Sequence, residues 1–180
     1  MTRTAPTAIR LLILDVDGVM TDGRLYYGPH GEALKCFHVR DGKGIQQLLA
    51  VGVQIGVLSG RRSKMTTARC RELGVRHLIQ GVSDKVREFE ALRSRLQLSV
   101  SECACIGDDV VDVPLMRTVG LAFAVADAHR EARRAADIIT KLPGGQGAVR
   151  EVCDHLLDAQ RRKLALARRR IGAATRGVST

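Results

Sequence analysis

The chain has 180 residues, of which 45% are hydrophobic and 27% are charged, and this balance predicts one globular domain and excludes general disorder. No apolar run approaches the ~20 residues of a membrane-spanning helix, and the N-terminal residues lack the apolar core of a secretory signal, so we predict a cytoplasmic protein outside the membrane. The formal net charge is +10, and +7 of it comes from residues 161–180, which contain no acid. The basic segment is therefore a tail on a nearly balanced domain.

Apolar runs alternate with amphipathic stretches from residue 10 onward. The first run is continuously apolar and ends in acid and glycine, which is typical of a buried parallel strand. Gly74 is expected to end one helix, and Ser83 or Asp84 to cap the next. In chain order, we predict strands over 10–15, 53–58, 77–80, 102–106, 121–125 and 137–139, and helices over 61–73, 85–96, 109–118, 131–136 and 148–160. This alternation predicts a doubly wound α/β fold with a mainly parallel sheet and helices on both faces.

Residues 24–39 interrupt this alternation. Two short β-like arms flank residues 28–31, which contain two glycines and a proline, and the pattern predicts a β-hairpin. The hairpin directly follows the first strand. It therefore starts at the carboxyl edge of the sheet, where doubly wound sheets place their ligands.

Four groups of polar residues follow predicted strands or begin a helix. They are Asp15 with Asp17 and Gly18, Ser59 with Arg61, Lys85, and Asp108 with Asp109 and Asp112. Each has an ordinary explanation by itself, as a turn residue, a helix cap or a solvated lysine. We nevertheless expect them to meet, because the carboxyl ends of parallel strands lie at one edge of the sheet.

Carboxylates that converge at this edge require a compensating cation. Such groups about 4 Å apart would repel by several kcal/mol per pair at an effective dielectric constant of roughly 20. An all-oxygen site beside phosphate-binding groups suits Mg²⁺. Ser59 offers a hydroxyl donor and Lys85 a fixed positive charge to a phosphoryl group. The combination predicts Mg²⁺-dependent chemistry on a phosphate ester.

The ordered motifs resemble those of a known family. Asp15-x-Asp17-Gly18, Ser59, Lys85 and Gly107-Asp108-Asp109-x-x-Asp112 are similar to the four motifs of the haloacid dehalogenase superfamily of phosphotransferases. Segments 15–23, 37–42, 58–61, 124–128 and 144–151 make the chain most similar to the 3-deoxy-D-manno-octulosonate 8-phosphate (KDO 8-phosphate) phosphatases. The resemblance implies a capless, Rossmann-like fold with a protruding hairpin. It also implies a phosphomonoester hydrolase that acts on KDO 8-phosphate in lipopolysaccharide biosynthesis.

The resemblance implies a role for each site residue. Asp15 would be the nucleophile that becomes an aspartyl phosphate, and Asp17 would act as general acid and then as general base. Ser59 and Lys85 would bind the phosphoryl oxygens. The Mg²⁺ ligands would be Asp15, the backbone carbonyl of Asp17 and Asp108, with Asp109 and Asp112 as supports that orient the site.

The resemblance also implies contacts with a carboxylate-bearing sugar phosphate. The matching residues are Asp17, His38, Val39, Arg40, Asp41, Gly42, Arg61, Arg69 and Lys85. Family members form homotetramers in which the hairpin and neighbouring chains complete the pocket. The apolar hairpin arms support the same assembly here, because a lone exposed hairpin is marginally stable. The glycine-rich segment 142–147 either enters a neighbouring active site or forms a plain turn before a helix.

We assign residues 1–160 to a single phosphatase domain and residues 161–180 to a partly disordered basic tail. One alternative substrate is a nine-carbon, sialic-acid-type sugar 9-phosphate. A second alternative is a non-catalytic, receiver-like phosphate-binding module, which would need an acceptor aspartate where this chain has Ser59. A third is nucleic-acid binding through residues 161–170, which the aromatic content of 3% disfavours.

The cysteines predict neither a metal site nor a disulfide framework. They are five, an odd number, and Cys103 and Cys105 lack the spacing of a metal or redox turn. We predict that all five are buried small hydrophobic residues in a reducing compartment.

Overall fold

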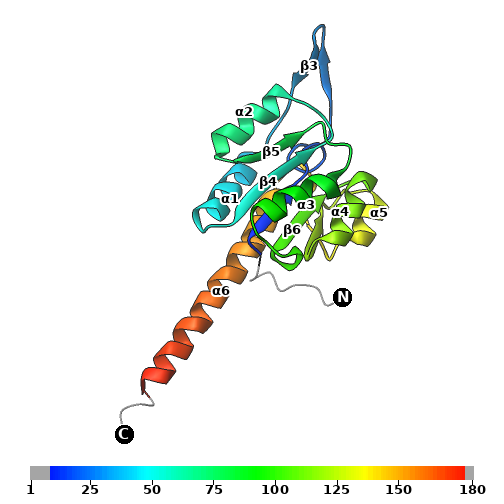
Figure 1. The fold of residues 1–180 in the computed structure, drawn as a ribbon. Helices are drawn as coiled ribbons and strands as arrows, with labels where there is room; N and C mark the ends of the chain where they lie inside the picture. Colours follow the sequence, from blue (N-terminus) through cyan, green and yellow to red (C-terminus); the bar gives the residue numbers. More distant parts are fainter. Residues whose placement is uncertain (1–8, 177–180) are drawn as a thin grey trace.

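A computed structural model describes residues 9–176, with side chains up to residue 162. Its elements are β1 (Leu11–Leu14), β2 (Tyr26–Gly28), β3 (Gly31–Leu34), α1 (Val39–Ala50), β4 (Gln54–Ser59), α2 (Lys64–Leu73), β5 (His77–Gln80), α3 (Lys85–Arg95), η2 (Val100–Glu102), β6 (Cys103–Gly107), η3 (Val110–Asp112), α4 (Val113–Thr118), β7 (Leu121–Ala124), α5 (Arg130–Ala135), β8 (Ile138–Ile139) and α6 (Ala148–Arg176). Six strands form one sheet in the order β5-β4-β1-β6-β7-β8 (Figure 1). Every neighbouring pair in it is parallel, which confirms the predicted doubly wound sheet.

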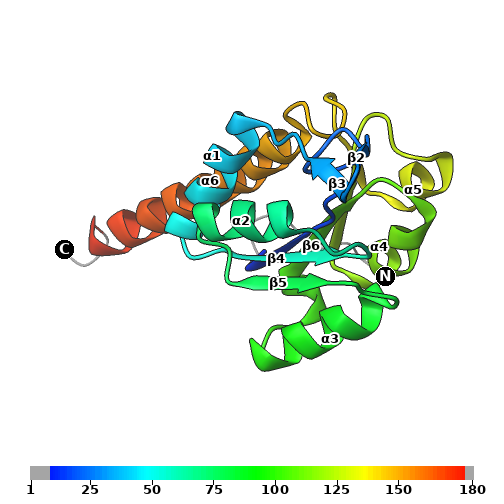
Figure 2. The same cartoon turned by 90° about the horizontal axis from the view of Figure 1, so that it is seen from above.

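The helices cover both faces of this sheet. Viewed from above, α1, α2 and α6 lie on one side and α3 lies on the other (Figure 2). Right-handed crossovers explain the sides on which α1, α2 and α3 lie, because the chain first winds from β1 toward β5 and then returns across the sheet toward β8. No helix within residues 9–176 has the length and apolar character needed to cross a bilayer.

Strand β1 lies in the middle of the sheet, between β4 and β6, and all of its residues are buried. Close packing of α3 depends on Gly56 in β4. A Cβ atom at that position would lie 2.6 Å from Ile13 and 3.0 Å from Leu92. Helix α3 therefore packs directly on the central strands, and this packing fixes the position of the residues that follow β1.

Two helix boundaries near the candidate site differ from prediction. Helix α2 begins at Lys64 rather than at residue 61, because Ser63 has the extended backbone of an N-cap. Arg61 consequently lies in a loop. The helix predicted over 109–118 is divided into the short turn η3 and helix α4, which carries Pro114 in its first turn.

Helix α6 is longer than predicted. It continues to Arg176 instead of ending near residue 160 (Figure 1). The added residues are rich in alanine, leucine and arginine, which have high helix propensity. Partial disorder of the segment 161–180 stays a prediction, since residues 177–180 and the side chains after residue 162 lie outside the description.

Strands β2 and β3 form an antiparallel pair that projects away from the main sheet (Figure 1). The pair is shorter than the predicted hairpin 24–39, because the chain leaves β3 after Leu34 and begins α1 at Val39. Cys36 lies in this connection and is exposed, so the prediction that all five cysteines are buried was wrong. The other four are buried.

Candidate active site

The predicted polar residues meet at the carboxyl edge of the sheet. They line a cavity of about 240 Å³ between the ends of β1, β4 and β6 and the start of α3. Its lining residues are Asp15, Asp17, Ser59, Gly60, Arg61, Val82, Ser83, Lys85, Asp108, Asp109 and Val111. Larger hollows lie elsewhere, but they lack this convergence of carboxylates, a hydroxyl and an amine.

Lys85 connects two carboxylates at the floor of this cavity. Its Nζ donates to Asp15 Oδ1 and to Asp112 Oδ1, both at 2.6 Å. Asp84 caps α3 by accepting the amide of Arg87, which places Lys85 as the first helical residue. Burial alone would lower the pKa of Lys85, but attraction to Asp15 and Asp112 outweighs it and raises that pKa. Lys85 is therefore a permanently charged group within the site.

Asp112 is fully engaged within the protein. Besides accepting from Lys85, its Oδ2 accepts the backbone amides of Asp108 at 3.1 Å and Asp109 at 3.2 Å. The side chain packs closely over Gly107, where a Cβ would lie 2.5 Å from Asp112 Cβ. Asp109 caps η3 by accepting the amide of Val110 at 2.7 Å. Asp112 thus orients Lys85 and the loop after β6, and it has little remaining capacity to bind an ion.

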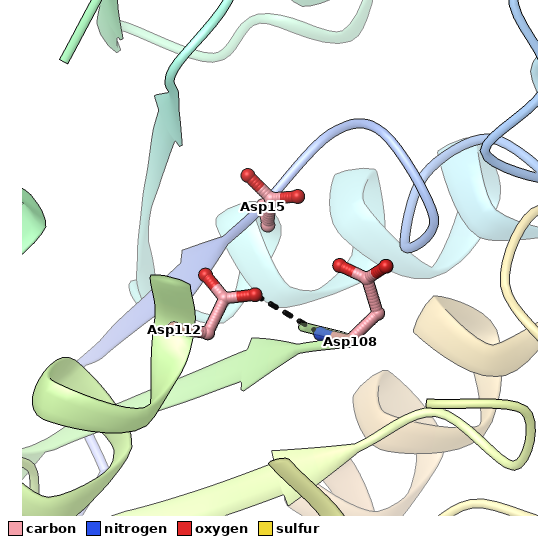
Figure 3. A group of neighbouring side chains, drawn as sticks. All are labelled: Asp15, Asp108 and Asp112. Atoms are coloured by element: carbon pink, nitrogen blue, oxygen red, sulfur yellow. Dashed lines mark hydrogen bonds between the residues drawn. The ribbon is translucent and has the colours of Figure 1, made fainter. Parts of the chain in front are cut away.

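Asp15 and Asp108 remain as carboxylates with room for a ligand. Together with Asp112, they offer oxygen atoms that all lie within 4.8 Å of one another (Figure 3). Burial raises the pKa of Asp15 to about 6, with Asp112 raising it further and Lys85 opposing the change. Burial and repulsion from Asp15, Asp112 and Asp109 raise the pKa of Asp108 to about 8.

The raised pKa of Asp108 reflects the crowding of carboxylates at this site, and that crowding bears on whether the site fits a metal ion. Three carboxylates face one ammonium group here, so negative charge remains in excess. A hard divalent cation with oxygen ligands would neutralise that charge. The donor set therefore fits Mg²⁺, held by Asp15 and Asp108. A contribution from the backbone carbonyl of Asp17 stays a prediction.

Ser59 and Arg61 line the opposite wall of the cavity. Ser59 is buried at the end of β4, and its Oγ accepts the backbone amide of Arg61 at 3.3 Å. Its hydroxyl hydrogen is then available to a phosphoryl oxygen. The Arg61 guanidinium lies 3.8 Å from Asp17 Oδ2 and donates to the Tyr27 hydroxyl at 3.1 Å. The hydroxyl and cationic groups predicted to bind phosphate therefore lie together.

The loop that carries Asp17 depends on glycine. Gly18 has φ +91°, and a Cβ there would lie 2.1 Å from Asp108 Oδ2, so only glycine allows Asp108 to approach the loop. The glycine-rich segment 142–147 supports the same loop within this chain. Gly145 donates its amide to the carbonyl of Val19 at 2.9 Å. Entry of this segment into a neighbouring active site stays a prediction.

Two residues beside Asp17 were not among those predicted from the sequence. Lys35 and Glu32, from the hairpin and its exit, form an ion cluster with Asp17 and Arg61. Nothing in the sequence marks Lys35 as different from the many solvated lysines and arginines of this basic chain. Its significance follows only from the fold, which brings the residue after β3 into contact with Asp17 after the end of β1.

The other predicted substrate contacts lie away from the cavity. His38 caps α1 by accepting the amide of Arg40. Asp41 is buried and accepts the amide of Arg150 at 2.8 Å, so it joins α1 to α6. Val39 and Arg40 are exposed.

Gly42 and Arg69 form part of the contact between α1 and α2. A Cβ at Gly42 would lie 2.3 Å from Arg69 Nη2. Arg69 itself pairs with Glu72 at 2.9 Å and lies over the ring of Phe37. Within one chain, residues 38–42 and Arg69 are thus not brought to the cavity, and their contacts with substrate stay a prediction.

Comparison with known proteins agrees with this geometry. Residues 74–151 match the family model of haloacid dehalogenase-like hydrolases. A curated relative from Escherichia coli K12, 3-deoxy-D-manno-octulosonate 8-phosphate phosphatase, is 50% identical over 152 residues, which are 84% of this chain and 81% of the relative. The phosphatase of the same name from Yersinia pestis has the same identity and coverage.

Solved structures show the same similarity. The Yersinia pestis phosphatase superimposes with a TM-score of 0.85 at 48% identity, covering 87% of this chain and 85% of that one. The phosphatase from Moraxella catarrhalis, solved with magnesium, phosphate and KDO, has a TM-score of 0.86 at 39% identity, covering 91% of this chain and 94% of that one. A cobalt-bound form from Haemophilus influenzae has a TM-score of 0.85 at 41% identity, with 87% and 92% covered.

Proposed function

Since the chain belongs to the 3-deoxy-D-manno-octulosonate 8-phosphate phosphatase family of haloacid dehalogenase-like hydrolases, we propose that it is a Mg²⁺-dependent phosphatase that hydrolyses KDO 8-phosphate. The observation that carries this proposal is the arrangement of Asp15, Lys85 and Asp108 at the carboxyl edge of the sheet. It combines a buried carboxylate held by an ammonium with an excess of negative charge that suits a divalent cation.

Asp15 is the nucleophile in the proposed reaction. A carboxylate oxygen of Asp15 attacks phosphorus, the bond between phosphorus and the sugar oxygen breaks, and an aspartyl phosphate forms. Lys85 holds Asp15 in place and offers positive charge to the phosphoryl oxygens, and Ser59 donates its hydroxyl to them. Mg²⁺, when bound by Asp15 and Asp108, supplies charge neutralisation for the phosphoryl group.

Asp17 transfers protons in both halves of the proposed reaction. It lines the cavity two residues after Asp15. In the first half, its carboxyl group gives a proton to the sugar oxygen as that oxygen leaves. In the second half, its carboxylate takes a proton from the water that hydrolyses the aspartyl phosphate. Phosphate is then released, and both carboxylates return to their starting states.

A panel of phosphorylated sugar acids tests the substrate. The purified chain is incubated with KDO 8-phosphate, a sialic-acid-type sugar 9-phosphate and a neutral sugar phosphate, each with Mg²⁺ or with EDTA. We expect Mg²⁺-dependent phosphate release, with kcat/KM at least ~10-fold higher for KDO 8-phosphate than for the nine-carbon compound. Preference for the nine-carbon compound would replace the substrate proposal. Equal rates in EDTA would contradict the metal-dependent mechanism.

We also propose a homotetramer in which neighbouring chains complete the substrate pocket. Leu25, Tyr27 and Leu34 on the hairpin are exposed, which favours a contact surface at this position. The location of the exposed Val39 and Arg40 outside the cavity supports the same idea, because their predicted substrate contacts would then be made between chains. Light scattering at assay concentration is expected to give a mass near four chains. A fully active monomer would refute this proposal.

A further inference from the structure

The ion cluster beside Asp17 contains two cationic side chains, Lys35 and Arg61, and Lys35 is the more deeply buried of the two. Its side chain is 2% exposed, and its Nζ contacts Asp17 Oδ1 and lies 3.1 Å from Glu32 Oε1. Burial of an ammonium group is unfavourable unless carboxylates surround it. The two acids provide that compensation. Lys35 is therefore held at one place by charge on both sides.

The hairpin provides the remaining contacts of this cluster. Glu32 lies on β3, and Lys35 follows that strand directly. From β2, Tyr27 accepts a hydrogen bond from Arg61, whose guanidinium lies 3.7 Å from Glu32 Oε1. Asp17 is thus bounded by Lys35 at Oδ1 and by Arg61 at Oδ2. The two oxygens of one carboxylate face two different cations.

We propose that Lys35 is a positioning residue that orients Asp17 for proton transfer, and that the hairpin thereby contributes to the reaction within its own chain. The inference rests on the proposed function. Asp15 is held by Lys85 from α3, whereas Asp17 follows the end of β1 in an irregular turn. Lys35 holds the carboxylate of Asp17 in place, as Lys85 holds the carboxylate of Asp15. Proton transfer requires this order, because the donor must lie within hydrogen-bond reach of the departing oxygen.

The chemistry of the leaving group separates this role from a merely structural one. An alkoxide leaving from a sugar phosphate needs a proton from Asp17. The p-nitrophenolate ion is stable and leaves p-nitrophenyl phosphate without one. Loss of orientation at Asp17 therefore slows the first half of the reaction for the sugar phosphate alone, while the second half slows for both substrates. Disruption of the fold or of Asp15 would slow every step equally.

The test compares Lys35→Met with Lys64→Met, whose lysine is exposed at the start of α2. Both full-length variants are assayed with Mg²⁺ on KDO 8-phosphate in steady state and on p-nitrophenyl phosphate by rapid mixing. For Lys35→Met, we expect kcat on KDO 8-phosphate to fall by ~10²–10³-fold, whereas release of p-nitrophenolate in the first turnover stays within about threefold of wild type. A burst of p-nitrophenolate should follow, since hydrolysis of the aspartyl phosphate becomes slow. Lys64→Met should behave as wild type.

Lys35→Arg provides a second measurement, because it keeps the positive charge beside Asp17. We expect it to regain part of the turnover that Lys35→Met loses on the sugar phosphate. A first-turnover release of p-nitrophenolate that falls as much as kcat on KDO 8-phosphate, or unchanged turnover on KDO 8-phosphate in Lys35→Met, would overturn the positioning role. Absence of Mg²⁺-dependent hydrolysis of both compounds by the wild type would contradict the proposed function itself, and the inference with it.

Discussion

Asp15→Asn is expected to lower Mg²⁺-dependent phosphate release by ~10⁴-fold or more, because the amide is a poor nucleophile toward phosphorus. The substitution is nearly isosteric, and its side-chain oxygen can still accept the hydrogen bond from Lys85. The fold should therefore persist. Steady-state release of phosphate from KDO 8-phosphate measures the loss, and circular dichroism checks the fold.

The covalent intermediate gives a second readout for this variant. Acid quenching of wild type during turnover of radiolabelled substrate should trap label on the protein, and Asp15→Asn should trap none. Asp84→Asn is a suitable control, because Asp84 is exposed beside Lys85 and asparagine caps helices as well as aspartate does. Near-normal turnover or trapped label in Asp15→Asn would exclude Asp15 as the nucleophile.

Asp108→Asn is expected to stabilise the metal-free protein while removing its response to Mg²⁺. The folded protein holds the pKa of Asp108 at about 8, chiefly through burial and then through repulsion from Asp15 and Asp112. In the unfolded chain this pKa is about 3.9. Between these two values the folded state binds a proton that the unfolded state lacks. Stability of the metal-free protein therefore falls as pH rises toward 8, and the loss is complete above it.

Asparagine removes this repulsion at every pH. In EDTA at about pH 9, we expect Asp108→Asn to raise the free energy of unfolding by about 1–3 kcal/mol, less than the full pKa shift implies because Asp108 is partly solvent-exposed. Added Mg²⁺ should raise the melting temperature of the wild type and leave that of the variant unchanged. Phosphate release should be lost together with metal binding.

Thermal unfolding in EDTA and in Mg²⁺ measures both effects. Asp109→Asn is the matched control, since Asp109 is exposed at the mouth of the cavity and stands outside the group of three carboxylates. It should keep the Mg²⁺-induced shift. Retention of the Mg²⁺-induced shift by Asp108→Asn would show that Asp108 is not a metal ligand. A variant less stable than wild type in EDTA would contradict the predicted repulsion at this position.

Much of the site was predictable because it depends on local sequence and sheet topology. Asp15 and Asp108 directly follow apolar runs, and parallel strands bring such positions to one edge. Lys85 follows an N-capping aspartate, so its place at a helix start was also readable. The extent of helices was less predictable. Helix α2 begins only after its N-cap Ser63, and α6 continues past residue 160. Capping geometry and helix propensity compete at helix ends, so such boundaries are hard to predict.

The surroundings of individual polar residues were not predictable from spacing. Asp41 belongs to a stretch that matches substrate contacts, yet it is buried against the backbone of Arg150. Cys36 was expected to be buried, yet it lies exposed in the connection between β3 and α1. In both cases, the direction of the side chain depends on how a helix or hairpin packs on distant parts of the chain.

The sequence by itself determined the order of strands and helices, the carboxylates and lysine at the sheet edge, and the family, since each of these is encoded in contiguous motifs. Only the tertiary structure decided that Lys85 joins Asp15 to Asp112, that burial and neighbouring carboxylates raise the pKa of Asp108, and that Lys35 contacts Asp17. The physical reason is that burial and Coulomb interactions depend on distances between residues far apart in the chain. Those distances exist only after the sheet has assembled and the end of the hairpin lies beside Asp17.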